Sequence, residues 1–173
     1  MTLSVERLFR EYHDPLVRYL TRRLGDRDWA EEVAQETFVR ALRQKEGELQ
    51  NERAWLFAVA TNLVRDEARK DARRRRHLEL LAAEAKDSVV EPPNDLERAE
   101  ERALARRAID ALGERDREAL LMREEGLDYN EIAEALELSV ASVGTTLSRA
   151  RRRLVEAYEE LRAAGDRQHK AGA

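Results

Sequence analysis

The stretch Asp128–Arg153 constrains the fold of this chain most strongly, because it reads as two short helices joined by a tight turn. Asp128 is a good N-cap for the first helix, and Glu131 three residues later completes a capping box. Ser139 is a good cap for the second helix, in which apolar residues recur at helical spacing. This pattern is typical of a helix-turn-helix, whose second helix can enter the major groove of DNA.

The expected outward face of that second helix carries short hydroxyls and arginines. Hydroxyls reach base edges or phosphates, and arginine binds guanine or phosphate, so this composition suits a major groove. An ordinary helical hairpin with solvated arginines is the alternative interpretation. The residues expected on this face are Ala141, Ser142, Gly144, Thr145, Ser148, Arg149 and Arg152.

The composition indicates an all-α protein with modest, mostly aliphatic cores. Of the 173 residues, 39% are charged and 5% are aromatic, and there are only seven Gly and three Pro. The absence of cysteine excludes disulfides and thiolate metal sites. His13, His77 and His169 lack metal-ligand spacing, and no Gly-rich phosphate loop is present. We therefore expect no metal, no cofactor, no small-molecule substrate and no enzymatic activity.

The chain shows no sequence sign of membrane insertion. No apolar stretch approaches the length of a transmembrane span, and the beginning MTLSVERLFREY does not resemble a signal peptide. We expect a cytoplasmic protein.

The charges are segregated along the chain, although the net charge is −4. Residues 65–76 contain seven basic and three acidic side chains, whereas residues 91–101 contain five acidic side chains and one arginine. Such segregation makes positive patches on an acidic molecule. Because non-specific affinity scales with the phosphates that are neutralised, we expect weak binding to bulk DNA without a partner.

Two small helical domains are expected, with boundaries at the prolines of DSVVEPPN. The first domain spans residues 1–77, a linker spans 78–95, the second domain spans 96–164, and a disordered tail spans 165–173. In the first domain, the apolar segment AWLFAVATNLV runs directly into the basic run RDEARKDARRRR. An earlier helix, capped by Asp28, carries carboxylates and an amide on one face, and Phe38 on it is either an exposed contact residue or a core residue.

Three stretches together resemble the extracytoplasmic-function sigma factors of bacterial RNA polymerase. AEEVAQETFVRAL is similar to the family's AEDLVQETFLRA. AWLFAVATNLVRDEARKDARRR is similar to the pattern aWLxxIArNlxxDxxRrxxRr, and REALLMREEGLDYNEIAEALELS is followed by LSRARRRL. The resemblance covers both domains in the family's order. It implies a region-2 domain and a region-4 helix-turn-helix domain joined by a flexible linker.

The resemblance also implies partners and roles. The partners would be core RNA polymerase, through its β′ clamp helices and β flap, promoter DNA and an anti-sigma factor. Residues implied to bind polymerase are Glu32, Gln35, Glu36, Phe38 and Leu42. Residues implied to read and open the minus-ten element, where captured unstacked bases offset the lost duplex energy, are Asn62, Arg65, Arg69, Lys70, Arg73, Arg74, Arg75 and Arg76. Residues implied for the minus-thirty-five element are Thr145, Ser148 and Arg149 for base reading and Ser139 and Arg152 for phosphate contacts.

Two other functions remain open at this point. A sigma-like decoy could sequester an anti-sigma factor without directing transcription, although the intact basic run argues against it. A DNA-binding repressor would leave the first domain unexplained. The chain also departs from many relatives at Gly144 and Thr146, where basic residues are common, so we expect a weaker electrostatic hold on the minus-thirty-five duplex.

Overall fold

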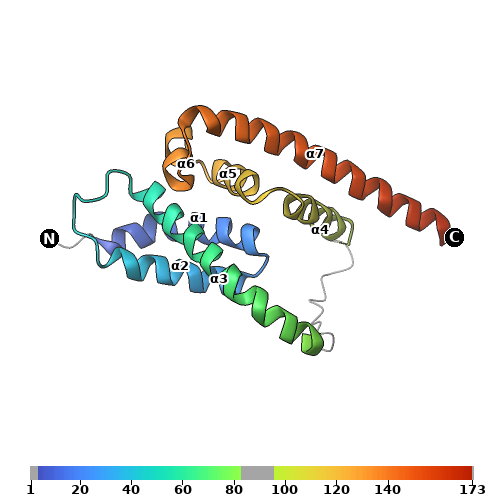
Figure 1. The fold of residues 1–173 in the computed structure, drawn as a ribbon, viewed down its shortest axis with the longest axis horizontal. Helices are drawn as coiled ribbons and strands as arrows, with labels where there is room; N and C mark the ends of the chain where they lie inside the picture. The colour runs from blue at the N-terminus through green and yellow to red at the C-terminus, as the bar shows by residue number, and fades with distance from the viewer. Residues whose placement is uncertain (1–3, 83–95, 173) are drawn as a thin grey trace.

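The computed structural model describes the backbone of residues 4–82 and 96–172, and the side chains of residues 4–67 and 96–172. Within these ranges the long regular elements are all α-helices, which confirms the all-α fold with a region-2-like and a region-4-like half (Figure 1). The helices are α1 (Val5–Leu24), α2 (Arg27–Ala41), α3 (Glu52–Ala82), α4 (Leu96–Asp110), α5 (Glu114–Glu124), α6 (Tyr129–Leu136) and α7 (Val140–Ala171).

The first domain is formed by α1, α2 and the first half of α3. Helix α1 packs against both α2 and α3, and its apolar stripe supplies the fully buried Leu8, Leu16 and Leu20. The Tyr19 hydroxyl lies in this core, 2.7 Å from the hydroxyl of Thr61 on α3. This hydrogen bond satisfies two polar groups that would otherwise be costly to bury.

Pro15 lies inside α1, and the helix continues through it. Apolar residues on both sides of Pro15 are buried in one core, and this burial offsets the backbone hydrogen bond that proline cannot make. Helix α1 ends at Gly25, which adopts a left-handed conformation with φ of 78°.

The start of α2 differs from the expectation by two residues. Asp26, and not Asp28, is the N-cap, because its side chain accepts a hydrogen bond from the backbone N–H of Trp29 at 3.1 Å. Asp28 lies inside the first turn, where its carboxylate faces the positive end of the helix dipole.

Helix α3 joins the apolar segment and the basic run in one rigid element. Asn51 caps it, as its side chain accepts from the N–H of Ala54 at 2.9 Å. The second half of α3 extends beyond α1 and α2 (Figure 1). Residues 78–82 of the expected linker belong to this helix, while 83–95, including the expected flexible part, lie outside the described residues.

The second domain contains α4 to α7, and α6 with α7 forms the helix-turn-helix. The capping box of Asp128 and Glu131 is present, and Ser139 caps α7 by accepting from the N–H of Ser142. The turn passes through Glu137, the one non-glycine residue with positive φ in the described part of the chain, at 55°. Left-handed backbone is unfavourable for a side chain with a Cβ atom, so this turn is strained.

The C-terminal segment corrects one expectation. Residues 165–171 continue α7 to Ala171, so they do not form a disordered tail. Alanine, arginine, glutamine and lysine all favour helix, and Gly165 alone costs about 1 kcal/mol of helix propensity relative to alanine.

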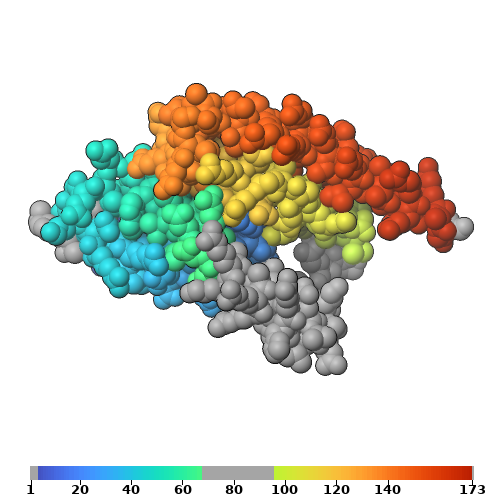
Figure 2. Space-filling view, viewed as in Figure 1, coloured from blue at the N-terminus to red at the C-terminus, as the bar shows by residue number. Residues whose placement is uncertain are grey.

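The two domains pack against each other. One cluster of buried apolar residues includes Leu16 of α1, Phe57 of α3, Leu121 of α5 and Ile132 of α6. Helix α3 contacts α6, and α1 contacts α5. In Figure 2, atoms of α5 and α6 lie directly against those of α3. The sequence did not predict whether the two domains pack together.

Candidate polymerase and DNA interfaces

One face of α2 is exposed while the opposite face is buried. Glu32, Gln35 and Glu36 are exposed, at the spacing that places residues on one side of a helix. Leu42, directly after the helix, is 55% exposed. The buried side is formed by Ala30, Val33, Ala34, Thr37, Phe38 and Ala41. A polar surface with an apolar end is therefore presented on a well-packed support.

Phe38 belongs to the core, with a side chain that is 5% exposed. Of the two possibilities that the sequence left open, the core position is the observed one. Phe9 of α1 covers it edge-on, with 5.2 Å between ring centroids, and Phe9 itself is 47% exposed. His13 stacks on Phe9 at 4.2 Å. The exposed aromatic of this region is therefore Phe9.

The expected minus-ten residues lie along α3. Asn62 is exposed. Arg65 is partly buried, and its Nη2 donates to Oε1 of Glu118 at 2.9 Å. The side chains of Arg69, Lys70, Arg73, Arg74, Arg75 and Arg76 lie outside the described residues, although the helical backbone that carries them is described.

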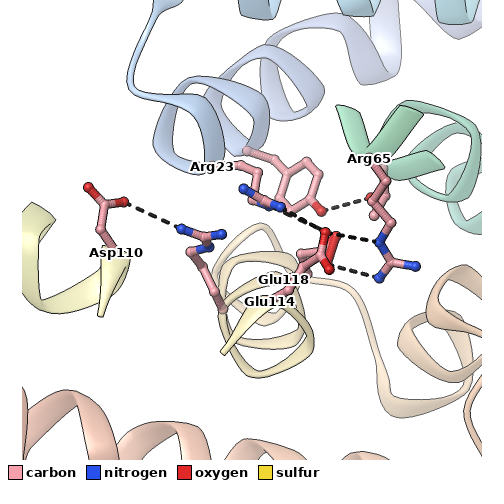
Figure 3. A network of polar contacts seen from close by, with 8 residues as sticks. Arg23, Arg65, Asp110, Glu114 and Glu118 are labelled. Atoms are coloured by element: carbon pink, nitrogen blue, oxygen red, sulfur yellow. Dashed lines mark hydrogen bonds and ion pairs between the residues drawn. The ribbon is translucent and has the colours of Figure 1, made fainter. Parts of the chain in front are cut away.

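Glu118 lies at the centre of a group of charges between the domains, which we call the Glu118 cluster: Glu114 and Glu118 of α5 with Arg23 of α1 and Arg65 of α3. Figure 3 shows Glu118 between the two arginines. Its carboxylate is fully buried, and its Oε2 lies 4.0 Å from Nε of Arg23. Glu114 is half-exposed and accepts from Nη2 of Arg23 at 3.2 Å.

The cluster is incompletely hydrogen-bonded. Within the described part of the chain, Oε2 of Glu118 and the Nε atoms of Arg23 and Arg65 have no hydrogen-bond partner. Burial raises the pKa of the Glu118 carboxyl, and the hydrogen bond from Arg65 opposes this shift without cancelling it. A carboxylate in this position depends on its arginines, because an unpaired buried charge is very unfavourable.

A second ionic contact joins α3 to the helix-turn-helix. Arg53 donates two parallel hydrogen bonds to Glu131, from Nε at 2.7 Å and from Nη2 at 2.5 Å. Glu131 also accepts from the backbone N–H of Asp128 at 3.1 Å, so one carboxylate serves the capping box and the domain contact together. The bond from Arg53 lowers the pKa of the Glu131 carboxyl.

Helix α7 presents most of its expected outward residues. Thr145, Ser148 and Arg152 are exposed. Ser139 is exposed as well, but its hydroxyl oxygen accepts the N–H of Ser142 at 3.2 Å as the helix cap. Thr146 is only 6% exposed, so this departure from the family pattern lies on the core side of the helix, where a basic side chain would not face a groove.

Arg149 is held by an acidic partner. Its guanidinium forms hydrogen bonds of 2.7 to 3.2 Å with both carboxylate oxygens of Asp116 on α5. Asp116 is buried, and Arg153 approaches its second oxygen at 3.5 Å. The Arg149 side chain remains 40% exposed. Arg149 therefore ties α7 to α5 and keeps part of its surface on the outward face.

Comparison with known proteins identifies the family. Residues 8–74 match Sigma-70 region 2, and residues 102–154 match Sigma-70, region 4. The ferric citrate uptake sigma factor FecI of Escherichia coli is 30% identical over 151 residues, covering 86% of this chain and 87% of the relative. The RNA polymerase sigma factor YlaC of Bacillus subtilis is 31% identical over 153 residues, covering 86% and 88%. This chain belongs to the extracytoplasmic-function sigma factor family.

A solved structure supports the same fold for this sigma factor. The sigma factor RpoE of Bartonella quintana, in complex with the anti-sigma factor NepR, aligns with a TM-score of 0.61 at 24% identity, over 89% of this chain and 98% of that one. The family directs transcription initiation and is not an enzyme family. Within the described ranges, no group of three His, Asp or Glu side chains could hold a metal ion, and no helix there could cross a membrane.

Sequence reasoning missed the acidic partners in this sigma factor. Glu118 shares a helix face with Leu121 and Met122, at spacings of three and four residues, and both of those are buried. The sequence feature that could have revealed this buried carboxylate is its position on an otherwise apolar helix face. Asp116 lies in the first turn of α5, where a carboxylate is also explained by the helix dipole.

Proposed function

We propose that this sigma factor binds core RNA polymerase and directs promoter-specific initiation through three separate surfaces. The α2 face binds the β′ clamp helices. The second half of α3 reads and opens the minus-ten element, and the start of α7 reads the minus-thirty-five element. The domain limits proposed for these tasks are 1–77 and 96–164, the second of which also docks on the β flap.

The polymerase-binding role is supported by the exposure of Glu32, Gln35 and Glu36 on one side of α2. These side chains contribute little to the core beneath them, so the fold does not explain their presence. Leu42 adds an exposed apolar side chain at the end of the same helix. An interface needs this combination of a polar rim and an apolar anchor.

The minus-ten role is supported by the continuity of α3. The buried half fixes the direction of the helix, so the basic run from Arg69 to Arg76 is carried on a rigid support. A cationic surface of this kind attracts phosphates and holds a separated strand. Asn62 and Arg65 begin this surface on the domain side.

The minus-thirty-five role is supported by the outward face of α7. Thr145 and Ser148 are exposed near its start, with Arg152 one turn further on. In our proposal Asp116 orients the guanidinium group of Arg149, which contacts base edges. Ser139 and Arg152 contact phosphates.

The remaining partner is an anti-sigma factor, by analogy with the complex of RpoE and NepR. We propose a cytoplasmic location and no catalytic activity. A decoy that sequesters an anti-sigma factor would use the same fold. The basic run in α3 favours the transcriptional role, because a decoy has no need to hold a DNA strand.

The deciding experiment is open-complex formation with purified core polymerase, followed by run-off transcription on genomic fragments. A sigma factor yields discrete transcripts, whereas a decoy yields none. In a second step, Gln35→Ala with Glu36→Ala should weaken core binding by about 1–3 kcal/mol for each anchor lost. Glu156→Ala with Glu160→Ala, two exposed carboxylates on α7, is the matched control. Equal core affinity for both double variants would remove the α2 face from the proposal.

A further inference from the structure

Two adjoining hollows lie where α1 meets α2. One, of about 360 Å³, includes the start of α2 and the last turns of α1. The other, of about 690 Å³, includes the start of α1 and Leu42 after α2. His13 and Asp14 line both, so the hollows follow each other along α1. Both volumes lie in the range of about 300–1,000 Å³ that is typical of small-molecule sites.

The smaller hollow is cationic, and we call it the cationic hollow. Arg18 and Arg22 of α1 and Arg27 of α2 line it, and Asp14 contributes the single carboxylate among its lining residues. The three arginine side chains are 55%, 51% and 76% exposed. Three accessible guanidinium groups around one concave surface favour an anionic ligand.

The three arginines keep most of their hydrogen-bond donors. Arg18 donates to Glu125 at 3.2 Å, and Arg22 approaches the same carboxylate only to 3.8 Å. Arg27 donates to Glu31 at 3.3 Å, in an exposed contact of little strength. A guanidinium has five N–H donors, so most of these donors are unused within the described part of the chain. Guanidinium groups bind phosphate oxygens in pairs, and three of them fit a ligand with several phosphate groups.

The larger hollow contains an exposed aromatic ring, and we call it the apolar hollow. Its lining includes Val5, Phe9 and Leu42, of which Phe9 and Leu42 are 47% and 55% exposed. His13 stacks on the Phe9 ring at 4.2 Å, and the edge contact with Phe38 is 5.2 Å between centroids. These contacts fix the orientation of the ring. A fixed, exposed ring is a surface on which a nucleobase stacks.

Charged side chains in the apolar hollow favour a nucleobase over an alkyl chain. Glu6 and Arg10 line this hollow together with Phe9. An alkyl chain would remove water from both charges without offering a hydrogen bond, which is unfavourable. The edge of a base offers N–H donors to a carboxylate and acceptors to a guanidinium. The lining therefore fits a flat ring with polar edges.

The distribution of charge favours a small molecule over a nucleic-acid strand. The arginines of the cationic hollow lie at one end, while Glu6 and Asp14 lie nearer the other. A strand carries a phosphate at every nucleotide and would meet these carboxylates, whereas a nucleoside polyphosphate carries its charge at one end. Phe9 and Arg18 are nine residues apart, which is about 14 Å along α1. An extended nucleoside triphosphate can span this distance.

We propose that the two hollows together bind a nucleoside polyphosphate, with its base against Phe9 and its phosphates on Arg18, Arg22 and Arg27. The first domain of this sigma factor is then a receptor for a soluble nucleotide. The inference does not depend on the proposed contacts with polymerase or promoter DNA, because the free chain binds the ligand.

The test is isothermal titration calorimetry of the full chain with GTP, whose base carries N–H donors for Glu6. The buffer contains no Mg²⁺, because this ion would compete with the arginines for the phosphates. We expect one GTP per chain. GTP should bind at least about tenfold more tightly than guanosine or inorganic triphosphate, because each of these fills only one hollow.

Three variants test the two ends of the site. Arg22→Gln should weaken the binding of both GTP and inorganic triphosphate by about tenfold. Phe9→Leu removes the stacking surface, so it should weaken GTP by about tenfold and leave inorganic triphosphate unchanged. Asp14→Asn removes a like charge and should tighten GTP by about threefold. Arg167→Gln, an exposed arginine on α7, is the matched control and should bind GTP as the wild type does.

Three results overturn the inference. The first is the absence of saturable GTP binding at millimolar concentration. The second is binding of inorganic triphosphate as tight as that of GTP, and the third is GTP binding that Arg22→Gln or Phe9→Leu leaves unchanged. Circular dichroism shows whether each variant folds. If Phe9→Leu does not fold, Leu42→Gln replaces it, because this lining side chain is 55% exposed.

Discussion

Two of the ionic contacts between the domains use the same residue types but differ in how well they are satisfied. At the Arg53–Glu131 pair, both carboxylate oxygens accept from Arg53, and one accepts a backbone N–H as well. At the Glu118 cluster, one carboxylate oxygen accepts from Arg65, and within the described residues the other has no hydrogen bond. The pKa shifts differ in direction accordingly, since that of Glu131 is lowered and that of Glu118 is raised.

This difference indicates that the two contacts have separate roles. A satisfied, partly exposed pair such as Arg53–Glu131 adds stability and fixes the relative position of α3 and α6. A buried, under-satisfied carboxylate adds little net stability, but it is very unfavourable once its partners leave. The Glu118 cluster therefore makes the contact all-or-none, because partial opening would strand a charge in an apolar surrounding.

The largest expected effect is that of Glu118→Ala. Truncation removes the buried one of the two carboxylates that pair with Arg23 and Arg65, leaving only the half-exposed Glu114 beside them, and should destabilise the packed protein by about 3 kcal/mol. We place the value at the low end of such effects because Arg65 is one-quarter exposed and can turn to solvent. The measurement is urea denaturation of the full chain.

Two probes sharpen this experiment. Both tryptophans, Trp29 and Trp55, lie in the first domain, so their fluorescence reports on that domain, whereas helical circular dichroism reports on both. In the wild type the two transitions should coincide, and in Glu118→Ala they should separate. A loss below 1 kcal/mol with coincident transitions would show that Glu118 does not join the domains.

A smaller effect is expected for Arg53→Ala. It removes both bonds to Glu131, but the carboxylate keeps its backbone donor at Asp128, so the loss should be about 1–2 kcal/mol. Arg7→Ala is the matched control, because Arg7 binds Glu52 through two hydrogen bonds of 2.7 and 2.9 Å within the first domain. Only Arg53→Ala should broaden the distribution of distances between spin labels at Glu6→Cys on α1 and Glu134→Cys on α6, both exposed positions in a chain without cysteine. Equal broadening by both variants would assign the effect to the first domain and not to the contact.

These contacts mark the limit of what the sequence could predict. The helix-turn-helix follows from local rules, since Asp128, Glu131 and Ser139 act within three residues of their own positions. The closed arrangement depends on pairs such as Arg53 with Glu131, separated by 78 positions, and in the sequence each partner looks like a solvated charge. The burial of Phe38 and the exposure of Phe9 could not be predicted for the same reason, because helix periodicity does not say which neighbouring helix covers a face.

The opposite pKa shifts predict opposite responses to pH. The native pKa of Glu131 lies below its ordinary value of 4.5, so its stabilisation is complete above that pH and is lost as pH falls through the native value. The native pKa of Glu118 lies above 4.5, so the protein loses stability as pH rises from there through the raised value. A plot of the urea midpoint against pH from 3 to 7 should therefore show two limbs. Stability rises with pH on the acid limb, which belongs to Glu131, and falls with pH on the limb above pH 4.5, which belongs to Glu118.

The variants should separate the two limbs. Arg53→Ala should flatten the acid limb only, because it removes the largest cause of the lowered pKa of Glu131. Glu118→Gln should flatten the limb above pH 4.5 only, since an amide does not titrate. If one variant flattens both limbs, the two contacts are lost together as pH changes. That result would contradict separate roles for them.

The smallest expected effect concerns a site that touches neither contact. Glu137 occupies a left-handed position in the turn between α6 and α7, with φ of 55°. Glycine adopts this backbone without strain, but it also gives the unfolded chain more freedom, so Glu137→Gly should stabilise the second domain by about 0.5–1 kcal/mol. Because Glu137 is exposed, the change should leave the label distance and both pH limbs as in the wild type.

A raised urea midpoint by circular dichroism, with an unchanged distance distribution, would show that the stability of the second domain and its packing on the first domain are independent. A narrower distribution in this variant would instead mean that the turn itself sets how closely α6 rests on α3.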